Sequence, residues 1–248
     1  PKSHIKKALA LTADTFGAKE SFFTVNGTSG GIQAMILSAV KPGEKILVPR
    51  NIHVSVSSGV ILSGAIPVYM QPEIDPNNGI IHGVSSSTVE HALSQHPDAK
   101  AVLVINPTYY GTSTDLVSIV DLVHSYDIPL LVDEAHGPHL CFSEQLPISA
   151  MAAGADACTQ STHKLLGALT QGSILHIQGH MIEGSRVRQV LSMLQTTSPS
   201  YPLLASLDVA RKQVALEGKE LVAQAISNAR WLRQAINVIE GMHCFGEE

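Results

Sequence analysis

The chain has 248 residues, 44% of them hydrophobic, which is enough for one large or two smaller globular domains with a sizeable core. Its 16 basic and 21 acidic residues give a net charge of -5, and no run of Lys and Arg exceeds two residues, which argues against nucleic acid and anionic membranes as partners. No apolar stretch reaches membrane-spanning length, and the first residues lack the basic-then-apolar pattern of a secretion signal.

Short apolar segments of strand length recur along the first two thirds of the chain and alternate with segments of helical periodicity. The expected helices cover residues 29–40, 51–63, 86–95 and 115–126. This alternation predicts an α/β fold with three layers, in which helices cover both faces of a mostly parallel sheet. The expected strands cover residues 21–25, 45–48, 66–69, 101–105, 129–132 and 157–160, with 173–177 as a further strand whose direction the sequence does not indicate.

From residue 182 onward the pattern is helical, and a long helix is expected from about residue 201 to 240, with a break near Gly218. A long helix that leaves an α/β domain often connects it to a second domain. We therefore expect residues 1–200 to form a large domain. Residues 201–248 would form the long helix and the start of a second, C-terminal domain that is largely missing.

The two ends of the chain indicate a fragment. The sequence begins with Pro1 rather than Met, and it stops at Glu248, just after an apolar stretch typical of the start of another strand. We therefore expect further sequence on both sides.

The cysteine usage bears on the cellular compartment. Cys141, Cys158 and Cys244 are odd in number, far apart in the sequence and without CxxC spacing. This pattern is typical of a reduced cytoplasmic protein, and we expect that location.

The segment 161–173 carries the most informative candidate for chemistry. Lys164 follows Ser161 and His163, and small and hydroxylated residues come after it, including Thr170-Gln171-Gly172-Ser173. A lysine amine in this setting can bind an aldehyde cofactor as a Schiff base, and pyridoxal 5'-phosphate (PLP) brings both an aldehyde and a phosphate. The alternative is a solvated surface lysine in a loop.

Further candidates follow the expected strands at their carboxyl ends, which is where open α/β sheets bind ligands. After the first strand, Asn26-Gly27-Thr28-Ser29-Gly30-Gly31 leads directly into a helix. Small residues let the backbone approach a phosphate closely, and a helix N-terminus offers free N–H groups and a favourable dipole. The same residues are also consistent with an ordinary helix start.

The strand at 129–132 runs into Asp133-Glu134-Ala135-His136-Gly137-Pro138-His139. A carboxylate at the end of a buried strand needs a partner, and a protonated pyridine nitrogen would suit Asp133, because the retained charge makes the ring an electron sink. A competing interpretation is a metal site built from Asp133, His136 and His139, as in a metal-dependent hydrolase. No further ligand cluster or HExxH-like spacing supports it, so we predict no metal.

Two other strand ends carry polar or aromatic side chains. His53 follows the strand at 45–48 and opens a helix, where it either lies flat against an aromatic cofactor ring or caps and packs locally. Thr108 follows the strand at 101–105 within Asn106-Pro107-Thr108-Tyr109-Tyr110-Gly111 and presents a hydroxyl to the same edge, although most such turns are only turns.

In combination and in this order, the motifs resemble PLP-dependent enzymes of the aspartate aminotransferase fold, and among them the Orn/Lys/Arg decarboxylase family. The resemblance covers nearly the whole chain. It rests on Ser161-x-His163-Lys164 with Thr170-Gln171-Gly172-Ser173, on Asn26-Gly27-Thr28-Ser29, on Arg50-Asn51-x-His53, on Asp133-Glu134-Ala135-His136-Gly137 and on Thr197-Ser198-Pro199-Ser200-Tyr201.

The resemblance implies roles for individual residues. Lys164 would hold PLP covalently, Asp133 would pair with the pyridine nitrogen and His53 would stack on the ring. His136 would lie near the ring or the substrate. The other implied cofactor contacts are Thr28, Ser29, Ser161 and His163 around the phosphate, together with Thr108 and Ser198.

The same resemblance implies a shared site, because active sites of this family form at a dimer interface. The segment 197–200, which includes Ser198, would approach the cofactor of a neighbouring subunit. A homodimer or a higher homo-oligomer is therefore expected.

The implied activity is the decarboxylation of a basic amino acid to the corresponding amine, in polyamine metabolism. Arginine, lysine and ornithine are the candidate substrates, and arginine or lysine is preferred by resemblance alone. Two alternatives remain open. One is another PLP reaction on the same fold, such as transamination or an aldolase-like cleavage, and the other is a non-catalytic PLP-binding or assembly fragment.

Overall fold

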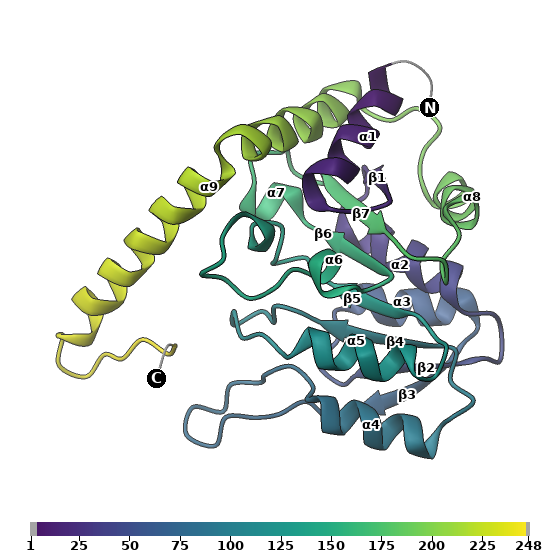
Figure 1. Cartoon of the computed structure of the whole chain (residues 1–248), viewed down its shortest axis with the longest axis horizontal. Helices are drawn as coiled ribbons and strands as arrows, with labels where there is room; N and C mark the ends of the chain where they lie inside the picture. The colour runs from purple at the N-terminus through teal and green to yellow at the C-terminus, as the bar shows by residue number, and fades with distance from the viewer. Residues whose placement is uncertain (1–3, 247–248) are drawn as a thin grey trace.

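The computed structural model describes residues 4–246 (Figure 1). The expectation of a truncated chain rests on Pro1 and Glu248, which lie outside the described residues. The strands are β1 (Glu20–Thr24), β2 (Lys45–Pro49), β3 (Ile66–Met70), β4 (Ala101–Ile105), β5 (Leu130–Asp133), β6 (Ala157–Gln160) and β7 (Ser173–Ile177). The helices are α1 (His4–Phe16), α2 (Gly27–Ala39), α3 (Val54–Ser63), α4 (Ser86–Gln95), α5 (Leu116–His124), α6 (Ala150–Ala153), α7 (Thr162–Leu165), α8 (Gly184–Leu194) and α9 (Tyr201–Asn237), with a 3-10 turn η1 (Leu140–Phe142).

The seven strands form one sheet in the order β1-β7-β6-β5-β4-β2-β3. Strand β7 runs antiparallel to both of its neighbours, β1 and β6, and the other neighbouring pairs are parallel. Six strands therefore end at the same edge of the sheet, which gives the predicted, mostly parallel arrangement. The direction of β7, which the sequence did not indicate, is antiparallel.

Two hydrophobic cores lie on opposite faces of the sheet. Helices α2, α3 and α8 contribute to one core, and α4, α5 and α6 contribute to the other (Figure 1). Strand β4 shows why the strands are continuous apolar runs: Leu103 belongs to the first core, whereas Val102 and Val104 belong to the second. The predicted three-layer α/β architecture is confirmed.

A third cluster closes the β1–β7 end of the sheet. Phe16 of α1 and Phe142 of η1 meet edge to face, with their ring centroids 5.7 Å apart, and Leu207 and Val214 of α9 pack into the same cluster. Helix α1, which the sequence analysis did not identify, thereby joins the start of the chain to its last helix.

The predicted break in the long helix is wrong. Helix α9 runs without interruption from Ser200, whose hydroxyl caps it, to Asn237. Gly218 faces the ring of Phe142, and a Cβ atom at this position would lie 2.8 Å from ring atom Cδ1. The glycine therefore accommodates a packed ring within the helix and does not end it.

Helix α9 packs on the sheet only along its first part. Its buried side chains end with Val222, whereas Trp231 is 69% exposed, and Figure 1 shows the later turns extending away from the sheet. The division of the chain at residue 200 remains a prediction. Within residues 4–246, no helix combines the length and the apolar character needed to cross a bilayer.

Candidate active site

A cavity of about 560 Å³ lies at the shared edge where the parallel strands end. The segments after five strands line it, as the strand-end rule predicts. Every residue proposed as catalytic or as a cofactor contact lines this cavity except Ser198. The lining residues at the strand ends include Asn26 to Ser29 after β1, Asn51 to His53 after β2, Thr108 to Tyr110 after β4, Asp133, Ala135 and His136 at β5, and Ser161, His163 and Lys164 after β6.

Lys164 and His136 lie side by side in the cavity. The two atoms Lys164 Nζ and His136 Nε2 lie 3.2 Å apart. Burial lowers the pKa of His136, and the positive charges of Lys164 and His53 lower it further. The lowered pKa favours the neutral imidazole, and an unprotonated Nε2 can accept a hydrogen bond from the Lys164 amine.

Asp133 is the last residue of β5, and its carboxyl group is buried at the inner end of the cavity. Burial raises the pKa of Asp133, while the Ala135 N–H, which donates to Oδ1 over 3.1 Å, and the charges of His53 and Lys164 oppose the increase. The net increase in pKa means that the hydrogen bond and the nearby charges do not offset the cost of burying the ionised carboxylate, so this carboxylate is under-compensated. A cationic N–H donor in the cavity, such as a pyridinium, would supply the missing partner.

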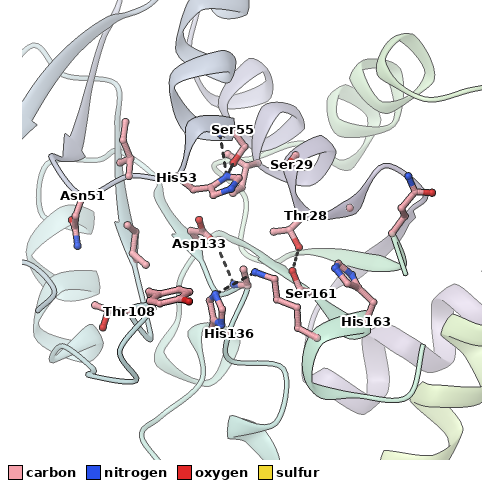
Figure 2. A pocket seen from close by; sticks show the side chains of 18 of the residues that line it. Thr28, Ser29, Asn51, His53, Ser55, Thr108, Asp133, His136, Ser161 and His163 are labelled. Carbon is pink, nitrogen blue, oxygen red and sulfur yellow. Dashed lines mark hydrogen bonds between the residues drawn. The ribbon is translucent and has the colours of Figure 1, made fainter. Parts of the chain in front are cut away.

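Three hydroxyl groups cluster where β1, β6 and β7 approach one another. Thr28 Oγ1 hydrogen-bonds to Ser161 Oγ (Figure 2) and lies 3.0 Å from Ser173 Oγ. Thr28 stands in the first turn of the 13-residue helix α2, whose N-terminus carries partial positive charge. Thr28 and Ser161 line the cavity, and their hydroxyls at the helix N-terminus fit a phosphate group, while Asp133 and Lys164 fit the pyridine nitrogen and the aldehyde of PLP.

His163 stabilises the loop that carries Lys164. Its Nδ1 lies 2.9 Å from the carbonyl oxygen of Gly172, and its backbone N–H donates to the same oxygen. These bonds join the two ends of the segment 163–172 beside the hydroxyl cluster. The sequence motif around Lys164 is therefore also a structural unit.

His53 caps helix α3. Its Nδ1 accepts the Ser55 N–H over 3.2 Å and lies 2.8 Å from Ser55 Oγ, so the ring is held in one orientation (Figure 2). The same ring lines the cavity. The capping interpretation is thus confirmed, and stacking against a cofactor ring remains a prediction.

The structure adds a polar group to which the sequence analysis gave no role. Asn51 lines the cavity, and its Nδ2 donates to the His82 carbonyl, whereas its buried Oδ1 has no hydrogen-bond partner among the described residues. The signal was its place at a strand end, two residues before His53. Tyr109 also lines the cavity, with its ring edge to face against His136.

Two predicted positions lie outside the cavity. Ser198 stands in the exposed loop between α8 and α9, so its expected contact with a neighbouring subunit remains a prediction. His139 precedes η1 and does not line the cavity. Within residues 4–246, no three His, Cys, Asp or Glu side chains gather in a way that would hold a metal ion, so the metal-site interpretation finds no ligand set there.

Comparison with known proteins gives a consistent family. The family model described as "Orn/Lys/Arg decarboxylase, major domain" matches residues 1–248. An arginine decarboxylase of Bacillus anthracis is 56% identical, and one of Bacillus subtilis (strain 168) is 52% identical, each over the whole chain. The chain covers 50% and 51% of these two proteins, so it spans about half the length of the curated relatives it matches. Among solved structures, lysine decarboxylase A from Pseudomonas aeruginosa superposes on 99% of this chain with a TM-score of 0.86, at 28% identity and over 36% of its own length.

Proposed function

The chain belongs to the Orn/Lys/Arg decarboxylase family, and from this membership we propose that it forms the PLP-binding major domain of an enzyme that decarboxylates a basic amino acid to the corresponding amine. The observation that carries the proposal is the convergence of Lys164, the under-compensated Asp133 carboxyl and the Thr28 and Ser161 hydroxyls in one cavity.

Arginine is the favoured substrate. Four curated relatives named arginine decarboxylase are between 52% and 56% identical to the chain, whereas the relatives named lysine decarboxylase are 28% and 30% identical. The proposed product is therefore agmatine, formed together with carbon dioxide and entering polyamine metabolism.

PLP, when bound, would supply an electron sink for the electron pair left behind as carbon dioxide departs. Lys164 would hold PLP covalently through Nζ. The His136 imidazole, whose Nε2 lies 3.2 Å from Nζ, would orient the Lys164 amine through a hydrogen bond. Asp133 would hold a proton on the pyridine nitrogen through its negative charge.

The remaining lining residues would orient and bind. Thr28, Ser29 and Ser161 would donate to the phosphate at the N-terminus of α2, with His163 supporting their loop. The ring of His53, fixed by its bonds to Ser55, would cover one face of the cofactor ring. Thr108 would add a hydroxyl contact from the turn after β4.

The proposed enzyme acts as a homodimer or a larger homo-oligomer in the cytoplasm. Among the described residues, Asp133 is the sole Asp or Glu that lines the cavity, and its proposed role is at the pyridine nitrogen. A carboxylate partner for the second positive group of a basic amino acid would then have to come from outside this set. A neighbouring subunit, approached through the loop that carries Ser198, is the proposed source. The proposed domain division remains residues 1–200 and 201–248.

The experiment that tests the proposal is PLP titration of the folded protein, followed by borohydride reduction and mapping of the modified residue. We expect a visible absorbance band and reduction that fixes the cofactor on Lys164, with no fixation in Lys164→Ala. Asp133→Asn should retain PLP poorly and release carbon dioxide from arginine much more slowly. Product analysis with arginine, lysine and ornithine separates decarboxylation from transamination and aldol cleavage. A folded protein without the band, or with the label elsewhere, would refute the assignment.

A further inference from the structure

A chain of four buried polar side chains crosses the sheet on the face opposite to Asp133. It begins at Glu134, the residue after β5, and continues through Gln160 of β6 and His176 of β7 to Ser21 of β1. Gln160 Nε2 donates to Glu134 Oε2 over 2.7 Å, His176 Nε2 lies 3.1 Å from Gln160 Oε1, and Ser21 Oγ lies 2.8 Å from His176 Nδ1. All four residues are at most 5% exposed.

The hydrogen bonds between these four side chains have one consistent direction. Gln160 donates its amide hydrogen to the Glu134 carboxylate, so its carbonyl oxygen must accept from His176 Nε2–H. His176 Nδ1 is then unprotonated and accepts from the Ser21 hydroxyl. Complete burial lowers the pKa of His176 to about 3, which is consistent with this neutral tautomer.

Glu134 is the member of this hydrogen-bonded set of side chains that lies nearest the cavity. Its Oε1 accepts the Ala150 N–H at the start of α6 over 2.7 Å, and its Oε2 also accepts from Cys158 Sγ over 3.5 Å. None of these hydrogen-bond partners of the fully buried carboxyl group is a cation. Burying a carboxyl group without a cationic partner costs more free energy than burying an apolar residue of similar size, so core stability alone does not account for a glutamate at this position.

The position of the Glu134–Gln160 bond relative to the cavity is informative. Glu134 directly follows Asp133, and Gln160 directly precedes Ser161 and lies four residues before Lys164. Two backbone hydrogen bonds join the same segments: the Glu134 N–H donates to the Thr159 carbonyl over 3.1 Å, and the Ser161 N–H donates to the Ala135 carbonyl over 3.3 Å. The buried Glu134–Gln160 side-chain bond, which is shorter than both, thus reinforces the link between the two segments that carry the proposed cofactor contacts.

We propose that Glu134 is a positioning residue, which acts through Gln160 to fix the place of Asp133 relative to the Ser161–Lys164 segment and so aligns the two ends of the PLP site. This inference rests on the proposed function. Misalignment of contacts on one rigid ligand weakens them all together, because the ligand cannot satisfy one end without straining the other.

A swap of the two side chains supplies a sharp test. Glu134→Gln leaves one side-chain oxygen for two buried donors, the Gln160 amide and the Ala150 N–H, so the pair of bonds cannot be kept. The double variant E134Q/Q160E can restore the bond in reverse. The amide introduced at position 134 would then donate to the carboxylate introduced at position 160, and the second oxygen of that carboxylate would accept from His176.

A matched control lies at the opposite end of the same two strands. Asp156 is also buried, and its Oδ2 accepts the Leu130 N–H and faces His124 Nε2, each over 2.9 Å. Asp156→Asn therefore perturbs a buried carboxylate between β5 and β6 without touching the cavity. Should E134Q fail to fold, Gln160→Met removes the Glu134–Gln160 bond while leaving the Glu134–Ala150 bond in place.

Two readouts are compared in all variants, alongside the thermal unfolding midpoint. The first is amide hydrogen exchange at Ala135 and Ser161 in the protein without PLP, and the second is the PLP dissociation constant with the absorbance spectrum of the bound form. We expect E134Q to accelerate exchange at both amides and to weaken PLP binding by about tenfold. The swap should restore both readouts, and Asp156→Asn should lower the midpoint while leaving both unchanged.

Three results would overturn the inference. Unchanged exchange and PLP affinity in folded E134Q would show that Glu134 does not position the segments. A folded swap variant that fails to restore them, or an equal effect of Asp156→Asn at matched stability, would assign Glu134 to general stability instead. These outcomes all presuppose that the unmodified protein binds PLP on Lys164, and failure of that step refutes the proposed function separately.

Discussion

Ionisation of Glu134 should destabilise the folded protein as the pH rises from about 5 to about 8. Burial raises the pKa of Glu134 from its ordinary value of 4.5 to about 7, against the hydrogen bonds from Gln160, Ala150 and Cys158, which lower it. In the unfolded chain the same carboxyl group ionises near its ordinary pKa. Between these two values the folded state therefore binds one more proton than the unfolded state, and stability falls with increasing pH.

The size of the effect follows from the two pKa values. A rise from 4.5 to about 7 corresponds to a loss of about 3 kcal/mol in the free energy of unfolding across this window. His176 opposes this trend over part of the window: burial lowers its pKa from 6.5 to about 3, so its contribution to stability rises with pH up to about 6.5. Asp133 shifts in the same direction as Glu134, so the effect has to be isolated by comparison with a variant.

The assay is urea unfolding followed by circular dichroism at several pH values, for the unmodified protein and for Glu134→Gln. Because contributions from the other groups largely cancel, the difference between the two free energies of unfolding reports mainly on Glu134. We expect the advantage of the unmodified protein to shrink by about 3 kcal/mol between pH 4.5 and 8 and then to level off. A difference that stays constant, or that grows with pH, would mean that hydrogen bonding outweighs burial and that Glu134 is ionised throughout.

Two further predictions concern stability away from the proposed chemistry. Asp156→Asn should lower the free energy of unfolding by about 1–3 kcal/mol, because it weakens the hydrogen bonds of this side chain with His124 and with the Leu130 N–H. Urea unfolding measures this change, and an unchanged midpoint would contradict the prediction. Gly31→Ala should lower the free energy of unfolding by about 1–3 kcal/mol, because the added Cβ would overlap Thr159 Oγ1. Gly30→Ala is the control, since its added Cβ would meet only Asn26 Cβ, at 3.5 Å. Equal thermal midpoints for the two variants would refute the packing argument.

Much of the sheet could be predicted from the sequence because its strands are buried on both faces. Strand β4 is apolar at every position, and its predicted limits agree with the observed Ala101–Ile105. The clustering of Thr28, Asp133 and Lys164 was also predictable, since parallel strands bring their carboxyl ends to one edge. The direction of β7 was not predictable, because it depends on how the loop at 161–172 turns back and not on the pattern within the strand.

Gly218 shows a different limit of sequence interpretation. A glycine within a helical pattern indicates a weak point when only local propensity is considered. Here the absent side chain makes room for Phe142, which lies 76 residues earlier in the sequence, and packing against that ring offsets the low helix propensity. Tertiary contacts of this kind leave no mark in the local pattern.

The buried chain from Glu134 to Ser21 was beyond prediction for a topological reason. Gln160, His176 and Ser21 are single polar residues in otherwise ordinary strands, and they become neighbours only because the sheet order is β5-β6-β7-β1. That order places β1, the first strand, beside β7, the last strand, which runs antiparallel between β1 and β6. A shift of any of these strands by one residue would turn its polar side chain to the other face and break the chain of hydrogen bonds. The buried polar residues therefore favour the correct register of β1 and β6, the two strands that lead into the Thr28 and Ser161–Lys164 segments. An error in the register of these strands would displace the proposed cofactor contacts.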